Sequence, residues 1–129
     1  MRRGASELVN HRPVPVQNEI ATQAEGYPEP PLVELTGGEP LLQKETPALM
    51  SALCNAGFTV LLETSGAHDI SEIDPRVHRI VDLKCPSSGE CERNLYSNLE
   101  HLRPGDEVKF VIGTREDYQW ASEHLRKIN

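Results

Sequence analysis

The sequence predicts an α/β fold built from parallel β/α units, and three observations support this. Short apolar runs alternate with helical stretches from Leu32 onward, as in other β/α proteins. The apolar runs are nearly continuous, which is typical of buried parallel strands. Four such units are present in 129 residues, whereas the closed eight-fold barrel takes roughly 250 residues. The pattern therefore predicts a doubly wound sheet or, at most, a partial β/α barrel.

The regular elements are predicted within residues 31–129. Strands are expected at residues 32–36, 58–63, 79–83 and 107–112. A helix is predicted over 45–56, with Gly57 as its terminator, because apolar residues recur there at helical spacing: Leu49, Met50, Leu53 and Cys54. Residues 92–102 are weakly helical. Thr114, with Asp117 three residues later, is the expected N-cap of a last helix, whose apolar face consists of Tyr118, Ala121, Leu125 and Ile128.

Residues 1–30 have a different composition and form a predicted irregular, proline-rich segment. Five prolines lie between Met1 and Pro31, and proline removes a backbone donor and disfavours helix in the residue before it. Residues 17–26 are compatible with a short helix that ends at Gly26.

Composition excludes several classes of protein. The chain has 13 basic and 20 acidic residues, a net charge of −7, which argues against binding nucleic acid through its phosphates. No window approaches the ~18–20 consecutive apolar residues of a membrane span. Arg2 and Arg3 precede no apolar stretch of the kind that signal peptides contain. Three cysteines in such a chain indicate reduced thiols and a cytoplasmic protein.

Three successive predicted strands end in polar or small residues, and functional groups gather at this end of parallel sheets. The first segment is residues 36–40 (TGGEP), where glycines allow close backbone approach and Glu39 can accept bonds from an ammonium group. The second, residues 63–66 (ETSG), has hydroxyls and amides that suit a carboxylate or a ribose. In the third, Asp82 and Lys84 point to the same face. Taken singly, each segment has a simpler interpretation. The first is compatible with an ordinary strand-to-helix turn, the second with a turn that has local side-chain bonds, and the third with an exposed edge strand that carries a surface ion pair.

Taken together and in this order, the segments resemble the radical S-adenosylmethionine (SAM) superfamily, and its 7-carboxy-7-deazaguanine synthase branch in particular. The matching segments are residues 32–42 (LVELTGGEPLL), 61–66 (LLETSG), 81–90 (VDLKCPSSGE) and 106–112 (DEVKFVI). The GGEP element is typical of the superfamily, whereas DLKCP and KFVI indicate the branch. The resemblance extends from about Pro31 to the end of the chain and implies a partial parallel β/α barrel of the radical SAM type.

The resemblance also implies a reaction and its ligands. Enzymes of this branch use SAM, a [4Fe–4S] cluster and Mg²⁺ to convert 6-carboxytetrahydropterin into 7-carboxy-7-deazaguanine with loss of ammonia, a carbon–nitrogen lyase reaction in queuosine biosynthesis. A reductant such as flavodoxin or ferredoxin supplies the electron, and homodimers are common in the branch. Carried over by position, Thr36 would contact the substrate. The expected SAM contacts are Gly38, Glu39, Ser65, Asp82 and Lys84.

The cluster motif of the family, Cys-x3-Cys-x2-Cys, does not occur in this chain. Cys54 is predicted to be a buried structural thiol, and the spacing of Cys85 and Cys91 fits no cluster motif. The five histidines are expected on the surface or in loops: His11, His68, His78, His101 and His124. With the cluster ligands and the magnesium contact missing, the chain resembles the C-terminal part of such a synthase, truncated and inactive by itself. The alternative is a non-catalytic remnant or SAM-fold binding module.

Overall fold

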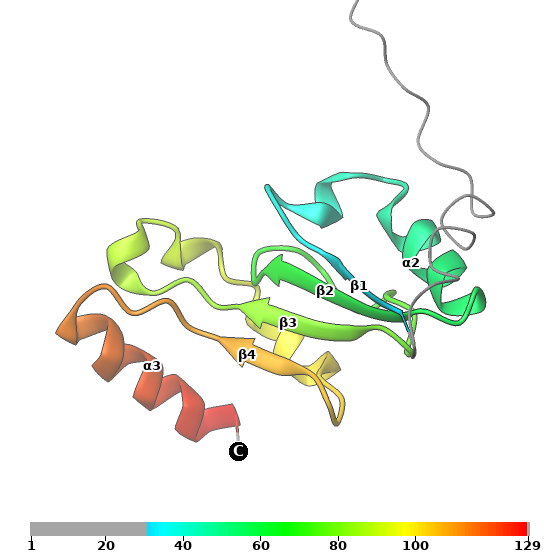
Figure 1. The fold of residues 1–129 in the computed structure, drawn as a ribbon. Helices are drawn as coiled ribbons and strands as arrows, with labels where there is room; N and C mark the ends of the chain where they lie inside the picture. Colours follow the sequence, from blue (N-terminus) through cyan, green and yellow to red (C-terminus); the bar gives the residue numbers. More distant parts are fainter. Residues whose placement is uncertain (1–30, 129) are drawn as a thin grey trace, which may run out of the picture.

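The computed structural model describes residues 31–128, in which four parallel strands form one sheet (Figure 1). The order across the sheet follows the order along the chain, β1-β2-β3-β4, and every neighbouring pair is parallel. The strands are β1 (Leu32–Leu35), β2 (Thr59–Ser65), β3 (His78–Asp82) and β4 (Glu107–Lys109). This arrangement confirms the expected partial parallel β/α fold. The proline-rich segment 1–30 and its helix over 17–26 lie outside the described residues.

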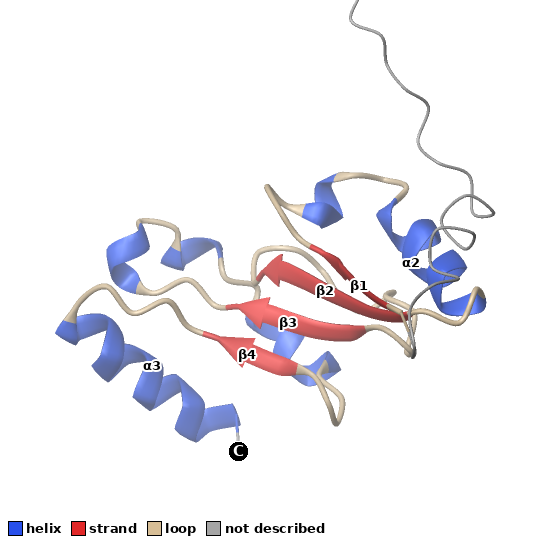
Figure 2. Ribbon diagram, in the orientation of Figure 1, coloured by secondary structure: helices blue, strands red, loops and turns tan. Residues whose placement is uncertain are grey.

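Within residues 31–128, two α-helices and several short 3-10 helices connect or follow the strands (Figure 2). Helix α2 (Thr46–Asn55) joins β1 to β2, and helix α3 (Arg115–Ile128) follows β4. The 3-10 helices are Pro40–Leu42, Pro86–Ser88, Cys91–Arg93 and Tyr96–His101. β4 ends at Lys109, whereas the apolar run predicts a strand to residue 112. The neighbouring strand β3 ends at Asp82. The last hydrogen bond between the two segments runs from the Leu83 amide to the Lys109 carbonyl oxygen, at 2.9 Å.

The region predicted as weakly helical, residues 92–102, contains two 3-10 helices and no α-helix. Two buried asparagines explain the difference, because their side chains bond to the backbone beyond β2 and β3. Asn94 pairs with the peptide groups of Lys84, and Asn98 bonds to Gly66, His68 and Ile70. These long-range bonds hold residues 91–101, here called the strap, against the backbone that follows β2 and β3.

The core lies on one face of the sheet, as the alternating burial of β2 shows. Val60, Leu62 and Thr64 are buried, whereas their neighbours in β2 are only half-buried. The buried strand residues pack with Met50 and Leu53 of α2 and with the loop between β2 and β3. The other face carries the half-buried or exposed residues of the strands, including Glu34, Glu63 and Lys109. Within residues 31–128, the hydrophobic core therefore lies on one face of the sheet only.

Helix α3 is rotated relative to the prediction. Tyr118 and Leu125, expected on its apolar face, are 64% and 49% exposed, whereas Asp117 and Ala121 are buried. The reason is the Asp117 carboxylate, which accepts bonds from the amides of Gly113 and Thr114 at 2.9 Å each and from Ser87. Thr114 is the predicted N-cap, and its hydroxyl accepts the Asp117 amide at 3.1 Å. His124, expected at the surface or in a loop, is half-buried in α3, where it stacks on Trp120.

No helix among residues 31–128 is long and apolar enough to cross a membrane.

Candidate functional site

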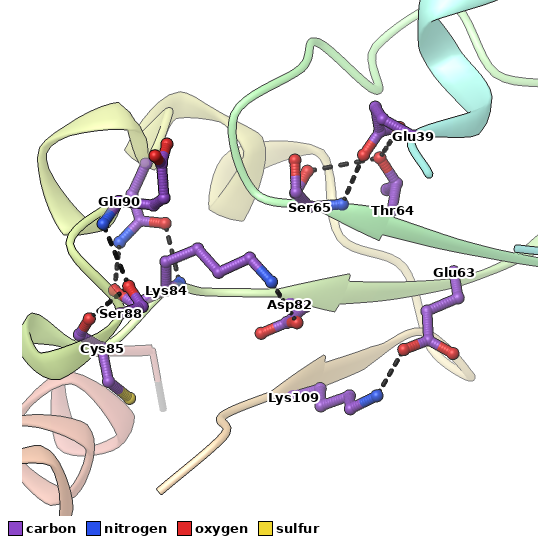
Figure 3. A network of polar contacts seen from close by, with 11 residues as sticks. Glu39, Glu63, Thr64, Ser65, Asp82, Lys84, Cys85, Ser88, Glu90 and Lys109 are labelled. Carbon is purple, nitrogen blue, oxygen red and sulfur yellow. Dashed lines mark hydrogen bonds and ion pairs between the residues drawn. The ribbon is translucent and has the colours of Figure 1, made fainter. Parts of the chain in front are cut away.

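The Glu39 side chain connects the turn after β1 to the end of β2 through hydrogen bonds (Figure 3). Its Oε1 accepts the Thr64 hydroxyl at 2.7 Å and the Leu41 amide at 3.0 Å, and its Oε2 accepts the Ser65 amide at 2.8 Å. Burial raises the pKa of Glu39, but these bonds outweigh it and hold the pKa below the ordinary value. A carboxylate offers about four acceptor positions, and these three bonds occupy most of them. The predicted neighbours Glu39 and Ser65 are therefore in direct contact.

Asp82 and Lys84 form the second part of the site, at the end of the next strand. Ser65 and Asp82 are register partners on β2 and β3, so the two contacts lie side by side (Figure 3). Lys84 Nζ donates to Asp82 Oδ2 at 2.7 Å. The Lys84 side chain is 32% exposed and that of Asp82 is 10% exposed. Asp82 Oδ1 is buried, and it has no hydrogen-bond partner in the described part of the chain.

Thr36 and Gly38 lie in the loop after β1 and are exposed. A Cβ placed on Gly38 would meet no heavy atom within 4 Å, so the backbone there is open to a molecule that approaches it. The preceding Gly37 has a φ of 116°, a conformation that side-chain-bearing residues rarely adopt. The loop therefore presents bare backbone next to the Glu39 carboxylate.

Four residues around the site make contacts that were not predicted from the sequence. Asn94 bonds to both peptide groups of Lys84, and Asp117 bonds to Ser87, three residues further along the same loop. Neither has a signal in the local pattern beyond the Thr114–Asp117 cap. Glu63 and Lys109 form an ion pair that joins β2 to β4 (Figure 3). Glu63 and Lys109 alternate along β2 and β4 with residues that are more buried than they are. This alternation is the signal that could have placed them on the face of the sheet away from the core.

Comparison with known proteins gives one consistent result. The chain is 44% identical over 112 residues to a 7-carboxy-7-deazaguanine synthase of Koribacter versatilis, covering 86% of this chain and 50% of that protein. It is 48% identical over 98 residues to the synthase of Chlorobaculum tepidum, covering 74% and 44% respectively. It is 43% identical over 97 residues to that of Methanospirillum hungatei, covering 74% and 40%.

The chain is a homologue of the 7-carboxy-7-deazaguanine synthases. It spans about half the length of the synthases it matches. No family model matches the chain, and no solved structure matches it either. The shared synthase name of these relatives does not favour the alternative of a non-catalytic binding module.

In this synthase homologue the three thiols do not come together. Cys54 lies near the end of α2, which leads into the start of β2, whereas Cys85 and Cys91 follow the opposite, carboxyl end of β3. Cys54 is half-buried and not fully buried as predicted, because it sits at the edge of the face that α2 packs on the core. Burial is the largest cause that raises the pKa of each thiol. Residues 31–128 contain no group of three or more His, Cys, Asp or Glu placed to hold a metal ion.

Proposed function

We propose that residues 31–128 bind SAM at the carboxyl ends of β1, β2 and β3. The observation that carries the proposal is a continuous series of contacts. Glu39 accepts the Ser65 amide, Ser65 is the register partner of Asp82, and Asp82 pairs with Lys84. Residues from three separate strand ends thus form one polar surface, next to the open backbone of Gly38.

The residues suit the parts of SAM. The Glu39 carboxylate, beside the Gly38 backbone, suits the methionine ammonium group because it carries the opposite charge. The partly exposed Lys84 suits its carboxylate, and the Asp82 carboxylate beside Lys84 suits a ribose hydroxyl. Thr36, exposed at the rim, would contact the pterin substrate. A few charged groups on a rigid sheet edge are what a zwitterionic nucleoside requires.

The proposal extends to the reaction of the relatives. It assigns the chain to a radical SAM carbon–nitrogen lyase that forms 7-carboxy-7-deazaguanine from 6-carboxytetrahydropterin, in the cytoplasm, with a flavodoxin or ferredoxin as reductant and a homodimer as its assembly. The described thiols do not converge as the ligands of a [4Fe–4S] cluster would, and residues 31–128 contain no group of three or more His, Cys, Asp or Glu placed to hold a metal ion. The role proposed for this part of the chain is therefore binding and orientation of SAM and substrate.

Isothermal titration of the chain with S-adenosylhomocysteine, a stable analogue that keeps the amino acid and nucleoside of SAM but not its sulfonium charge, tests the proposal. We expect saturable binding and a loss of about tenfold in affinity for Lys84→Ala, because a charge-assisted contact is removed. Lys44→Ala is the matched control, since Lys44 is exposed outside the series of contacts, and its affinity should stay unchanged. No binding by the unmodified chain, or equal affinities for the two variants, would refute the proposed function.

A further inference from the structure

Lys84 lies just beyond the point where β3 stops pairing. The Asp82 carbonyl accepts the Gly66 amide at 2.9 Å, and the Leu83 amide donates to the Lys109 carbonyl at 2.9 Å. These bonds hold the chain between β2 and β4 up to Leu83. At Lys84 both peptide groups bond instead to one side chain, that of Asn94. Asn94 Oδ1 accepts the Lys84 amide at 2.9 Å, and its Nδ2 donates to the Lys84 carbonyl at 2.9 Å.

This two-bond contact has the pattern of one more step of sheet pairing, made by a side-chain amide. Asn94 is buried, and the next residue is anchored as well, because the Leu95 amide donates to the Gly66 carbonyl at 2.7 Å. Gly66 leaves room for the arrangement. A Cβ there would lie 2.7 Å from Leu83 Cδ2 and 3.4 Å from Asn94 Oδ1. The strap is therefore fitted closely against the two strand ends.

We propose that Asn94 is a positioning residue that keeps Lys84 extended past the end of β3, so that its ammonium group stays on Asp82. An extended backbone places residues 82 and 84 on the same face, and the 2.7 Å contact between their side chains requires that alternation to continue. Asn94 bonds to the peptide groups of Lys84 and not to its ammonium group. Its effect on SAM rests on the proposed function, whereas its effect on Lys84 does not.

The test compares two buried asparagines of the same strap. Asn94→Asp keeps the size of the side chain but replaces the donor to the Lys84 carbonyl with an oxygen. Asn98→Asp makes the same change where Nδ2 donates to the carbonyls of Gly66 and His68, away from Lys84. Both variants lose buried hydrogen bonds, so both should melt at lower temperature. Only Asn94→Asp should change the behaviour of Lys84.

The direct readout is the acetylation rate of Lys84 in the folded protein, measured by mass spectrometry against Lys44 in the same sample. We expect the rate to rise about threefold or more in Asn94→Asp, as the ammonium leaves Asp82, and to stay unchanged in Asn98→Asp. S-adenosylhomocysteine affinity should fall about fivefold in Asn94→Asp only. Equal Lys84 rates in the unmodified chain and Asn94→Asp, or equal rises in both variants, would overturn the inference.

Two further comparisons distinguish a failure of this inference from a failure of the proposed function. If the unmodified chain does not bind S-adenosylhomocysteine, the proposed function fails, and the Lys84 rate still decides whether Asn94 positions Lys84. If Asn94→Asp does not fold, hydrogen exchange of the unmodified chain decides. The Lys84 amide should then be protected to the same degree as the Leu83 amide. Exchange of the Lys84 amide as fast as in an exposed loop would overturn the inference.

Discussion

Replacing Arg79 with Met should destabilise the fold more than any change of an exposed ion pair. The Arg79 side chain is fully buried on the core face of the sheet and pairs with Asp106, whose side chain is 3% exposed. It also donates to the carbonyl oxygens of Ile70, at 3.2 Å, and of His101. Removing it leaves a buried carboxylate and two carbonyls without this donor, and breaking a buried pair in this way costs about 3–5 kcal/mol.

The structure places the cost at the lower end of that range. Asp106 would retain two amide donors, from residue 79 at 3.0 Å and from Arg103 at 2.8 Å. We therefore expect a loss of about 3 kcal/mol in the free energy of unfolding, a large part of the roughly 5–15 kcal/mol of a small domain. Urea denaturation followed by circular dichroism and by the fluorescence of Trp120, the single tryptophan, measures it.

Arg76→Met is the matched control, because Arg76 is paired with Asp74 but its side chain is 51% exposed. Its cost should be much smaller than that of Arg79→Met, because exposed ion pairs contribute little to stability.

The pH dependence separates the ion pair from simple packing. Burial raises the pKa of Asp106, but the bonds from Arg79 and from the amides of residues 79 and 103 hold the pKa below its ordinary value. This carboxylate therefore stabilises the fold above the unfolded pKa of about 3.9, and the contribution is lost as the pH falls through the folded pKa. Without Arg79, protonation relieves the buried charge. The difference between Arg79→Met and the unmodified chain should narrow below about pH 4. A cost equal to that of Arg76→Met, or one that does not vary with pH, would refute this reasoning.

Three further predictions concern the site. Thr64→Val removes the 2.7 Å bond to Glu39 at nearly constant volume, and urea denaturation at pH 7 should show a loss of about 1.5 kcal/mol that shrinks as the pH falls below the ordinary pKa of Glu39. Asp117→Asn should lower the melting temperature more at pH 7 than at pH 3, because bonds from Ser87 and from the amides of Gly113 and Thr114 hold the pKa of Asp117 below its ordinary value. An equal drop in melting temperature at the two pH values would contradict this. Anaerobic incubation with iron, sulfide, reductant and SAM should give neither cluster absorbance nor 5′-deoxyadenosine, because the three thiols lie at opposite ends of the sheet. Both signals above a protein-free control would show that the chain assembles an active centre.

The parallel sheet and the polar strand ends could be predicted because both are encoded locally. An apolar run followed by TGGEP or ETSG identifies a strand and its carboxyl end within about ten residues of sequence. Parallel pairing then brings successive carboxyl ends to one edge, whatever the lengths of the connections. This is why Glu39, Ser65 and Asp82 could be assigned to one edge before any coordinates were known.

The remainder depended on contacts between distant segments. The rotation of α3 follows from Asp117 bonding to Ser87, 30 residues earlier, which overrides the apolar periodicity of Tyr118 and Leu125. The 3-10 strap over 91–101 follows from Asn94 and Asn98, whose partners lie 10 to 32 residues away. No local pattern distinguishes an asparagine that bonds across the fold from one that faces water.

These long-range contacts determine where the geometry of the candidate site originates. Glu39 is fixed by the end of β2, Lys84 by Asn94, and the loop after Lys84 by Asp117 of α3. Every one of these bonds is made within residues 31–128. The thiol of Cys54, in contrast, is separated from those of Cys85 and Cys91 by the length of the sheet. Ligand binding and turnover therefore place separate demands on this chain: under the proposed function the polar surface of residues 31–128 serves the first, and the second needs thiolates that converge on one cluster.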